Sequence, residues 1–384
     1  MSKLTVGIIG DGQLGMLLCE AAPALDLATV MLTSDQYCAA AQRADSCIEG
    51  AMDDASAIEA LVDACDIITY EREDIPAPAV TVLRRAEQAG SVTCHPSLDV
   101  IELIQDKARQ KTWLAENKLA TLPFRIVDGS RQQLQQGAQE LGFPLVQKAP
   151  RGGFDGRGVQ VLKNADELTK VWPGTTVLEA FAGDFCEIAV LIARGADGAC
   201  THFGPVGMTF ETEYSVLDTV FAPADISAEQ ESEAIDLAQR AIAAMNGVGV
   251  FGVEMFLLSD GRILINEISP RVHNAGHYTL EACHSSQFEQ HLRAVTGMPL
   301  ANAALKTPAA MRNLLCTPAL KKEDKHRDAG CETVDETRVY WYGKSPARLM
   351  RKLGHITATA ATREQALQRV NEQWNRIQDE ANKA

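Results

Sequence analysis

The segment GVEMFLLSDGRILINEISPRVHNAGH, residues 252–277, contains two apolar stretches joined by a Ser-Asp-Gly sequence. Asp-Gly between alternating apolar stretches is a strong signal for a β-hairpin. Glu254 lies on the first predicted strand and Glu267 at the end of the second, so antiparallel pairing brings the two carboxylates close together. Burying two neighbouring carboxylates is costly unless a cation lies between them. Because Mg²⁺ binds one or two carboxylates together with phosphate oxygens, the hairpin predicts a site for a metal–nucleotide complex.

Polar side chains follow the predicted hairpin directly: Arg271, His273, Asn274 and His277. A solvent-exposed hairpin edge is the simpler alternative for either glutamate alone, since charged residues are mostly exposed. The pair of carboxylates, followed by an arginine, two histidines and an asparagine, favours the metal–nucleotide site.

The composition is typical of a globular protein that does not bind nucleic acid or membranes. The 384 residues predict two or three domains, since single hydrophobic cores stop growing at about 250–300 residues. The formal net charge of -15 argues against a nonspecific nucleic-acid surface and against an anionic-membrane surface. The first residues lack the apolar core of a signal peptide, and no apolar run reaches the roughly 18 residues of a membrane span. Ten scattered cysteines without a C-x-x-C pair then predict reduced thiols in a cytoplasmic protein.

The N-terminal region predicts a parallel α/β unit. An apolar strand at 4–9 leads into the glycine loop Gly10–Gly15, a helix and a second strand that ends near Asp35. A glycine loop at a helix N-terminus binds anions, and an acid placed like Asp35 binds ribose in dinucleotide-binding folds. An NAD site is therefore one hypothesis, although many βαβ units use such glycines only to pack helix against strand. A third strand, 66–70, ends at the acidic patch Glu71–Asp74, on the sheet edge where ligands of such folds bind.

Basic residues and glycines dominate the next part of the chain. One charged helix is predicted over 98–119, and a later strand carries Lys148. Between two predicted strands, residues 150–158 read PRGGFDGRG, with four glycines and two arginines. A hairpin turn needs only about two to five residues, so the extra glycines and charge favour a flap that covers an anion.

Two further segments predict contacts with a nucleotide. Residues 175–193 read as two buried strands, with Glu179 and Glu187 on either side of their connection, where an acid suits ribose hydroxyls. Near the C-terminus, a basic cluster in this acidic chain predicts a phosphate site: Lys344, Arg348, Arg351, Lys352 and His355. The alternative to binding is that the charged residues of both segments are solvent-exposed surface residues.

Two other segments carry structural predictions only. Residues 208–222 show no clear periodicity, and we expect irregular structure there. In the terminal helix, four apolar residues share one face at helical spacing and are expected to be core residues: Leu367, Val370, Trp374 and Ile377.

The order of these motifs resembles that of the ATP-grasp carboxylate–amine ligases, and within them the N5-carboxyaminoimidazole ribonucleotide synthetases of purine biosynthesis. The resemblance rests on the YE-x-E patch, the QDK-x3-K helix, the GGFDGRG flap and the LEAF…E connection. It rests most on NEISPRVHNAGHYT, because the pattern NEI-x-PR-x-HN-x-GH is specific for the family, whereas the glycine loop is not. It continues through SQFEQHLRAVTGMPL and RKLGHIT, so it covers almost the whole chain.

The resemblance implies an α/β (α+β) protein with the ATP-grasp fold, divided into three domains. These are an N-terminal Rossmann-like pre-grasp domain (1–96), an ATP-grasp domain (97–300, with a flexible subdomain at about 120–190) and a small C-terminal β-rich domain (301–384). It also implies that ATP phosphorylates bicarbonate to carboxyphosphate, and that the exocyclic amine of aminoimidazole ribonucleotide captures the carboxylate. ATP, Mg²⁺ and bicarbonate are then required, and a cytoplasmic homodimer is expected.

Residue roles follow from the resemblance at matching positions. The metal ligands would be Glu254 and Glu267. The ATP-binding residues would be Lys107, Lys148, Gly153, Gly156, Glu179, Ala180, Phe181, Glu187 and Asn266. The catalytic residues, bordering bicarbonate and the aminoimidazole, would be Arg271, His273, Asn274 and the flap residue Asp155. The residues that bind the ribonucleotide would be Gln13, Glu73, Lys344 and Arg351, with the last two at its phosphate.

The chain departs from the family pattern at several positions. The flap carries Phe154 where a tyrosine is usual and continues as GRGVQ, and the acidic patch carries Asp74 where an amide is common. Residues 204–217 lack the usual E-N-x-H segment. A related ATP-grasp ligase with a different acceptor is therefore a second hypothesis, and a nucleotide-sensing paralogue without turnover is a third. The hypothesis of an NAD-dependent oxidoreductase assigns no role to the hairpin, the flap or the basic cluster.

Overall fold

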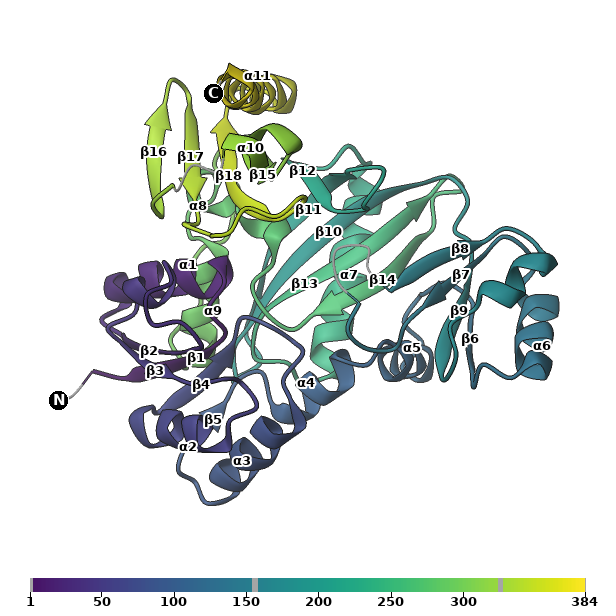
Figure 1. Cartoon of the computed structure of the whole chain (residues 1–384), viewed down its shortest axis with the longest axis horizontal. Coiled ribbons are helices and arrows are strands. Elements are labelled where there is room, and N and C mark those ends of the chain that lie inside the picture. Colours follow the sequence, from purple (N-terminus) through teal and green to yellow (C-terminus); the bar gives the residue numbers. More distant parts are fainter. Residues whose placement is uncertain (1–2, 154–157, 324–326, 384) are drawn as a thin grey trace.

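Three β-sheets make up the framework of the protein in a computed structural model that describes residues 3–153, 158–323 and 327–383. A parallel sheet lies at the N-terminal end, a long sheet runs through the centre, and a small sheet stands to one side (Figure 1). The mixed α/β class expected from the sequence is confirmed. The division into domains at residues 96 and 300 stays a prediction.

The N-terminal sheet is parallel, with the strand order β3-β2-β1-β4-β5. Its strands are β1 (Thr5–Ile9), β2 (Ala28–Thr33), β3 (Ser46–Glu49), β4 (Ile67–Tyr70) and β5 (Thr93–Cys94). Its connections include α1 (Gln13–Ala21), η1 (Ala22–Leu25), η2 (Ala41–Arg43), α2 (Ala55–Ala64) and α3 (Ala77–Gln88). Val6 and Ile8 are buried against α1, whereas Ile9 is buried on the face that α2 and α3 cover. Both faces are covered, which explains the continuous apolar sequence of β1.

The central sheet is antiparallel, with the strand order β14-β13-β10-β11-β12-β15-β18-β17-β16. The first five strands in this order are β14 (Ile263–Ser269), β13 (Gly249–Leu258), β10 (Phe185–Arg194), β11 (Cys200–Phe210) and β12 (Leu217–Ala222). The other four are β15 (Ala309–Leu315), β18 (Lys352–Thr359), β17 (Thr337–Trp341) and β16 (Gly330–Val334). The C-terminal strands therefore extend the central sheet, through the pairing of β12 with β15. Because β11 and β12 cover most of residues 208–222, the expectation of irregular structure there was wrong.

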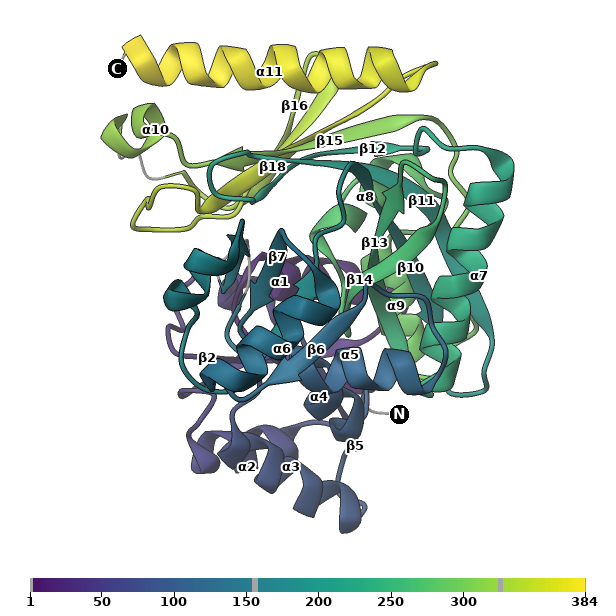
Figure 2. The same cartoon turned by 90° about the vertical axis from the view of Figure 1, so that its right-hand side faces the viewer.

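Helices cover both faces of the central sheet. Helix α7 (Ala228–Ala244), which starts with a capping box at Ser227, packs on one face, and α9 (Gln287–Val295) packs on the other. Helix α11 (Arg363–Lys383) runs across β15 and β18 (Figure 2). Its residues Val370 and Ile377 are buried and Leu367 and Trp374 partly buried, so the predicted core face is confirmed. Shorter helices are η4 (Asn274–Gly276), α8 (Thr279–Ala282) and α10 (Pro318–Glu323).

The small sheet is antiparallel, with the strand order β6-β9-β7-β8. Its strands are β6 (Phe124–Val127), β9 (Thr176–Ala180), β7 (Leu145–Lys148) and β8 (Val159–Leu162). Helix α6 (Arg131–Leu141) and η3 (Ala165–Lys170) pack against it, and Leu134, Leu145 and Leu178 form its separate core. This core is distinct from the cores of the other two sheets, and the small sheet stands to one side of the molecule (Figure 1).

The single helix predicted over 98–119 is two helices, α4 (Leu98–Ile104) and α5 (Lys107–Glu116). Asp106 takes an extended conformation between them, and its carboxylate accepts hydrogen bonds from the N–H groups of Ala108 and Arg109. An aspartate N-cap of this kind starts a new helix and ends the old one. The break places Lys107 in the first turn of α5.

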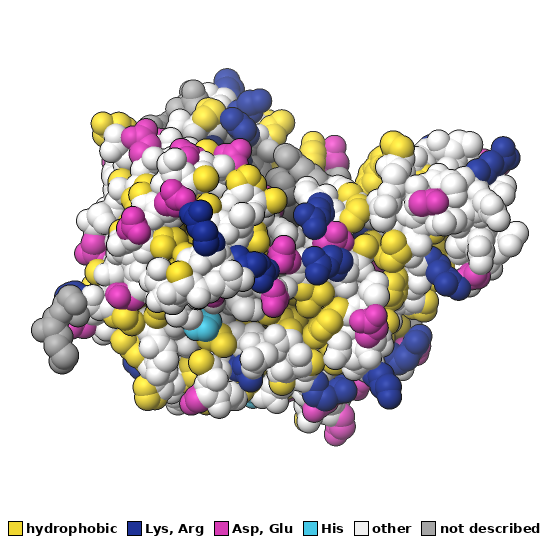
Figure 3. All heavy atoms as spheres, turned by 90° about the horizontal axis from the view of Figure 1, so that it is seen from below, with side chains coloured by type: hydrophobic (Ala, Val, Ile, Leu, Met, Phe, Trp, Pro, Cys, Tyr) yellow, Lys and Arg dark blue, Asp and Glu magenta, His cyan; other side chains and the backbone are white. Residues whose placement is uncertain are grey.

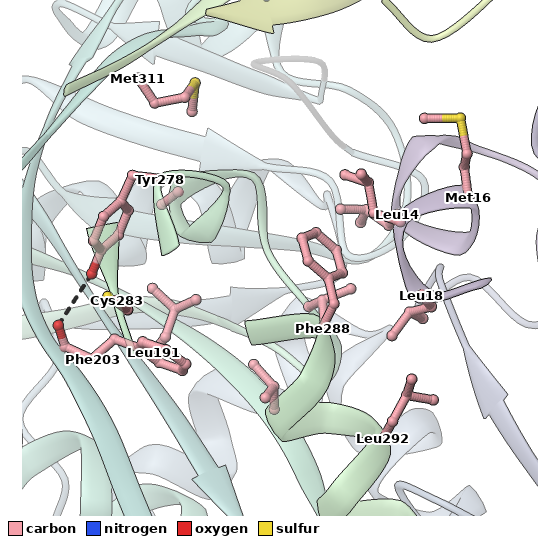
Figure 4. Close-up of a cluster of buried hydrophobic side chains, with 14 of the residues drawn as sticks. Leu14, Met16, Leu18, Leu191, Phe203, Tyr278, Cys283, Phe288, Leu292 and Met311 are labelled. Atoms are coloured by element: carbon pink, nitrogen blue, oxygen red, sulfur yellow. Dashed lines mark hydrogen bonds between the residues drawn. The ribbon is translucent and has the colours of Figure 1, made fainter. Parts of the chain in front are cut away.

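A shared core fixes the N-terminal sheet against the central sheet. Leu14 and Leu18 of α1 face Phe288 and Leu292 of α9, all of them buried (Figure 4). Nearby, the buried Tyr278 hydroxyl donates to the Phe203 carbonyl across 3.1 Å. Fully burying one large apolar side chain stabilises a fold by about 1.5–3 kcal/mol, so this cluster holds the glycine loop firmly in place.

The charge of the surface and the length of the helices are the features that can indicate nucleic-acid or membrane binding, and the structure describes both of them. On the face seen in Figure 3, Lys and Arg side chains are interspersed with Asp and Glu, so that face is mixed in charge rather than uniformly basic. Within the described residues, no helix is long and apolar enough to span a bilayer.

Candidate active site

The predicted hairpin is present, and it brings the two glutamates together. Glu254 on β13 is the direct partner of Glu267 on β14. Immediately after this pair the register shifts, so that Met255 pairs with Ile265 and Asn266 is the extra residue of a β-bulge. A bulge re-aims side chains, and the Asn266 amide oxygen accepts a hydrogen bond from Lys148 Nζ across 2.8 Å.

Each carboxylate of the pair has a nitrogen partner. Lys107 Nζ from α5 forms an ion pair with Glu267, and His273 Nε2 lies 2.9 Å from Glu254 Oε1. Burial favours the neutral form of Glu267 and so raises its pKa. The positive charge of Lys107 has the larger effect and lowers the pKa of that carboxyl to about 2. On β10, burial and the charges of Glu254 and Glu267 together raise the pKa of Glu187 to about 8. Negative charge is therefore concentrated where these three strands run side by side.

The carboxylate pair fits a hard divalent cation. Burial is the largest cause of the raised pKa of Glu187, and the negative charges of Glu254 and Glu267 add to it, so a cation between those two carboxylates would oppose the increase. Within residues 3–153, 158–323 and 327–383, no group of three or more His, Cys, Asp or Glu side chains is arranged to hold a metal alone. This arrangement suits Mg²⁺, which binds through one or two carboxylates and takes its other ligands from phosphates and water.

A buried ion-pair cluster lies beside the hairpin. Glu179 on β9 is 1% exposed, and its two oxygens lie 2.7 Å from Lys111 Nζ and 2.7 Å from Lys148 Nζ. Lys148 thus reaches from the small sheet to the central sheet, where it meets Asn266. The sequence placed Lys111 in a charged helix but did not assign it to the site. Its link to the site is visible only in the folded protein, where Lys111 is 3% exposed and pairs with Glu179.

Other predicted nucleotide contacts lie at or just beyond the ends of strands of the small sheet, with Ala180 as the last residue of β9. The Ala180 N–H donates to the Pro123 carbonyl across 2.9 Å, so it is already used by the fold. Phe181, just beyond the end of β9, is 43% exposed. Gly153 lies at the start of the predicted flap, while Gly156 and Asp155 fall outside the described residues.

The segment after β14 is held by side-chain amides. The Gln287 side chain accepts from the His273 N–H across 2.8 Å and donates to the His273 carbonyl across 2.7 Å. The Asn274 side chain exchanges two hydrogen bonds with Asn313 of β15, at 3.1 and 2.7 Å. Asn274 is therefore engaged within the protein. The supporting residues Gln287 and Asn313 gave no sequence signal of this role, because each is separated from its partner along the chain.

Arg271 and Glu73 form an ion pair that the sequence did not predict. The Arg271 Nε lies 2.6 Å from Glu73 Oε2. Burial lowers the pKa of the Arg271 guanidinium, but Glu73 outweighs it and the pKa is raised. This contact joins the acidic patch of the N-terminal sheet to the segment after the hairpin.

The glycine loop is filled by a carboxylate of the protein itself. Glu71 accepts hydrogen bonds from the N–H groups of Gly12 and Gly15, each across 2.8 Å. A Cβ at Gly10 would lie 2.3 Å from the Glu71 side chain. Burial raises the pKa of Glu71, although the Gly15 N–H opposes this. Since Glu71 takes the backbone donors that a dinucleotide phosphate would need, the loop does not serve an NAD site.

Residues from opposite ends of the chain meet next to this loop. Lys344 Nζ donates to the Gln13 side chain, and it lies 5.3 Å from the centre of the Tyr342 ring. Arg351 instead donates to the carbonyls of Ser345 and Pro346, within its own loop.

The basic cluster predicted at 344–355 needs one correction. His355 is fully buried on β18, where its Nδ1 lies 2.7 Å from the Tyr342 hydroxyl. Burial lowers the pKa of His355 to about 3, so it is neutral near pH 7 and is not a phosphate ligand. No alternation in the sequence marked this burial, because Gly354 to Ala358 of β18 are all buried and both faces of the strand are covered.

Three family models match consecutive parts of the chain. They are described as a ribonucleotide synthetase preATP-grasp domain (residues 3–105), an ATP-grasp domain (112–288) and a phosphoribosylaminoimidazole carboxylase C-terminal domain (309–369). The ATP-grasp fold expected from the motifs is confirmed.

Curated relatives are identical to the chain at about a third of the aligned positions. The N5-carboxyaminoimidazole ribonucleotide synthase of Brucella melitensis is 35% identical over 92% of this chain and 95% of its own length. That of Bacillus subtilis is 34% identical, over 96% and 95%. The phosphoribosylaminoimidazole carboxylase of Ogataea methanolica is 37% identical over 93% of this chain, but the chain spans only 66% of that longer protein.

Solved structures agree with these matches. The N5-carboxyaminoimidazole ribonucleotide synthetase of Thermotoga maritima has a TM-score of 0.83 at 35% identity and covers 96% of this chain and 97% of its own. The N5-carboxyaminoimidazole synthase of Aspergillus clavatus, in complex with ADP and 5-aminoimidazole ribonucleotide, has a TM-score of 0.85 at 30% identity and covers 97% and 99%.

Proposed function

The chain belongs to the N5-carboxyaminoimidazole ribonucleotide synthases, and we propose that it carries out their reaction, the ATP-dependent carboxylation of 5-aminoimidazole ribonucleotide in purine biosynthesis. The protein is thus an ATP-dependent ligase. The structural observation that carries the proposal is the carboxylate pair Glu254–Glu267, which Lys107 approaches from α5 while Lys148 approaches the adjoining Asn266 from the small sheet.

We propose that the nucleotide lies between the small sheet and β14. Lys107 and Lys148 would bind its phosphate oxygens, and Glu254 and Glu267 would hold Mg²⁺. When bound, Mg²⁺ neutralises charge on the phosphates and makes the terminal phosphorus easier to attack. The adenine would contact the C-terminal end of β9 near Phe181, and Glu187 would meet the ribose. Positioning and charge neutralisation are what this reaction needs, because bicarbonate is a weak nucleophile and the phosphoryl group is anionic.

The acceptor would lie on the other side of the same hairpin. Lys344 and Gln13, which already touch, would bind the ribonucleotide with Glu73 and Arg351. Arg271 and His273 would then lie between the acceptor and the phosphates, where carboxyphosphate forms from bicarbonate. Carboxyphosphate is labile in water, so the glycine-rich flap that contains Asp155 has the role of excluding solvent.

We further propose that the protein is a cytoplasmic homodimer. All ten cysteines are free, which fits a reducing compartment. The dimer is proposed from the family resemblance alone, and sedimentation equilibrium at micromolar protein tests it.

The test of the function is an assay of ADP release. ADP should form in the presence of bicarbonate, and 5-aminoimidazole ribonucleotide should stimulate its release. ADP formation that requires a different amine would replace the acceptor and leave the ligase class intact. Binding of the nucleotide without turnover, with every substrate present, would favour a sensor over an enzyme.

A further inference from the structure

Lys111 has no place in the proposed chemistry, yet it is one of the most deeply buried charged residues of the protein. Its side chain is 3% exposed, and its Nζ lies 2.7 Å from Glu179 Oε1 and 2.7 Å from the hydroxyl oxygen of Thr121. Burying a lysine costs several kcal/mol unless it is paired and hydrogen-bonded. A lysine that is buried despite this cost is expected to have a role in the structure or in binding.

The reason lies in the charge balance of the cluster. Glu179 is shared by two ammonium groups, since its second oxygen lies 2.7 Å from Lys148 Nζ. Two positive charges and one negative charge leave one net positive charge. Without Lys111, the single carboxylate would neutralise Lys148 completely.

The surplus charge is directed at the nucleotide site. Lys148 Nζ reaches across to Asn266 on β14, next to Glu267 of the carboxylate pair. Lys111 is held from the opposite side, because the Thr121 hydroxyl to which it donates itself donates to the Ile265 carbonyl across 2.8 Å. The chain of contacts thus ties α5, the small sheet and β14 together, with α5 packed against β9 (Figure 1).

We infer that Lys111 is a positioning residue for nucleotide binding: it occupies one oxygen of Glu179, so that the ammonium of Lys148 keeps a net positive charge facing the phosphates. The inference rests on the proposed function, because it takes the anion beside Lys148 and Asn266 to be a nucleotide. Lys111 touches no substrate in this arrangement. It acts only through Glu179 and Lys148.

The protonation of Lys111 makes the effect dependent on pH. Burial lowers the pKa of Lys111 to about 8, although Glu179 opposes the decrease, while Lys148 and Lys107 add to it. These are the charged groups that face Lys111 from β9, from β7 and from its own helix. Above a pH of about 8 the cluster loses its surplus charge, so nucleotide affinity is expected to fall as pH rises through that value.

The test measures nucleotide affinity directly. Calorimetric titration with a non-hydrolysable ATP analogue and Mg²⁺ compares the native protein with Lys111→Met and with the double variant Lys111→Met/Glu179→Gln. The single variant should bind about 10- to 100-fold more weakly, the loss expected when a charged hydrogen-bonding partner is neutralised. The double variant should recover most of that loss, because removing Glu179's charge frees Lys148 again. A merely structural role for Lys111 predicts no recovery.

Two controls separate charge from general damage. Arg109→Met removes an exposed positive charge from the same helix and should leave the affinity unchanged. Lys111→Arg keeps the charge and should abolish the decrease in affinity above pH 8, a measurement that does not depend on whether Lys111→Met folds.

The inference is overturned if Lys111→Met binds the analogue with native affinity, if the double variant binds as weakly as the single one, or if Lys111→Arg keeps the native pH dependence. These outcomes leave the proposed function intact, provided that the native protein binds the analogue and releases ADP. Failure of the native protein to bind the analogue would instead refute the proposed function itself.

Discussion

Replacing Glu281 by glutamine should stabilise the protein above neutral pH. Glu281 lies on α8, and its Oε1 accepts a hydrogen bond from the Tyr340 hydroxyl, with the Thr357 hydroxyl next to the carboxyl group. Burial raises the pKa of Glu281 to about 7, although Tyr340 partly opposes this. The carboxylate is therefore charged at pH 8 in a place that disfavours the charge.

The magnitude follows from linkage between protonation and folding. The folded protein holds the proton of Glu281 up to a pH of about 7, whereas the unfolded chain releases it near 4.5. The stability that this group contributes is fully present below about pH 4.5 and is lost as the pH rises through 7. At about 1.36 kcal/mol for each pH unit, the loss is about 3 kcal/mol. Glutamine keeps an acceptor for Tyr340 and carries no charge, so Glu281→Gln should recover up to that amount.

Thermal unfolding at pH 5 and pH 8.5 checks this prediction. For 384 residues the entropy of unfolding is roughly 0.8 kcal/mol per kelvin, so a gain of about 3 kcal/mol raises Tm by about 4 °C at pH 8.5. At pH 5 the gain should be only about 1 °C, because the unfolded chain has by then lost its proton only in part. Glu332→Gln, an exposed position on β16, is the matched control and should change Tm at neither pH. A Tm at pH 8.5 no higher than that of the native protein, or an equal gain at pH 5, would refute the reasoning.

Three further changes test the site. Glu267→Gln removes half of the carboxylate pair and the partner of Lys107, so kcat should fall at least about 100-fold; near-native ADP release would remove Glu267 from the metal site. Lys344→Met should raise the KM for the ribonucleotide about 10-fold or more and leave the KM for ATP unchanged, and an unaltered ribonucleotide KM would contradict the phosphate assignment. Gln287→Leu leaves the buried N–H and carbonyl of His273 without their partner, so urea titration should show a loss of about 2–4 kcal/mol; a loss below about 0.5 kcal/mol would show that other groups replace Gln287.

Local patterns in the sequence determined much of the architecture. The Asp-Gly turn between apolar strands predicted the hairpin, and strand pairing then brought Glu254 opposite Glu267. The strand that carries Lys148 was also predicted, and the helical spacing of four apolar residues predicted the buried face of the terminal helix. These features depend on residues close together in the chain. The break between α4 and α5 depends on a local signal as well, the Asp106 cap. This signal was missed in the sequence because the whole segment has the charged composition of a single helix.

Only the tertiary structure decided which polar groups become partners. The glycine loop has the spacing of an anion site, yet the folded chain delivers Glu71 into it from the end of β4. Lys344 meets Gln13 across 331 positions of sequence. Lys111 is one of several lysines in a charged helix until β9 places Glu179 against it. The physical reason is that turns and strand periodicity arise from neighbouring residues, whereas the partner of a buried charge depends on which distant elements the hydrophobic core packs together.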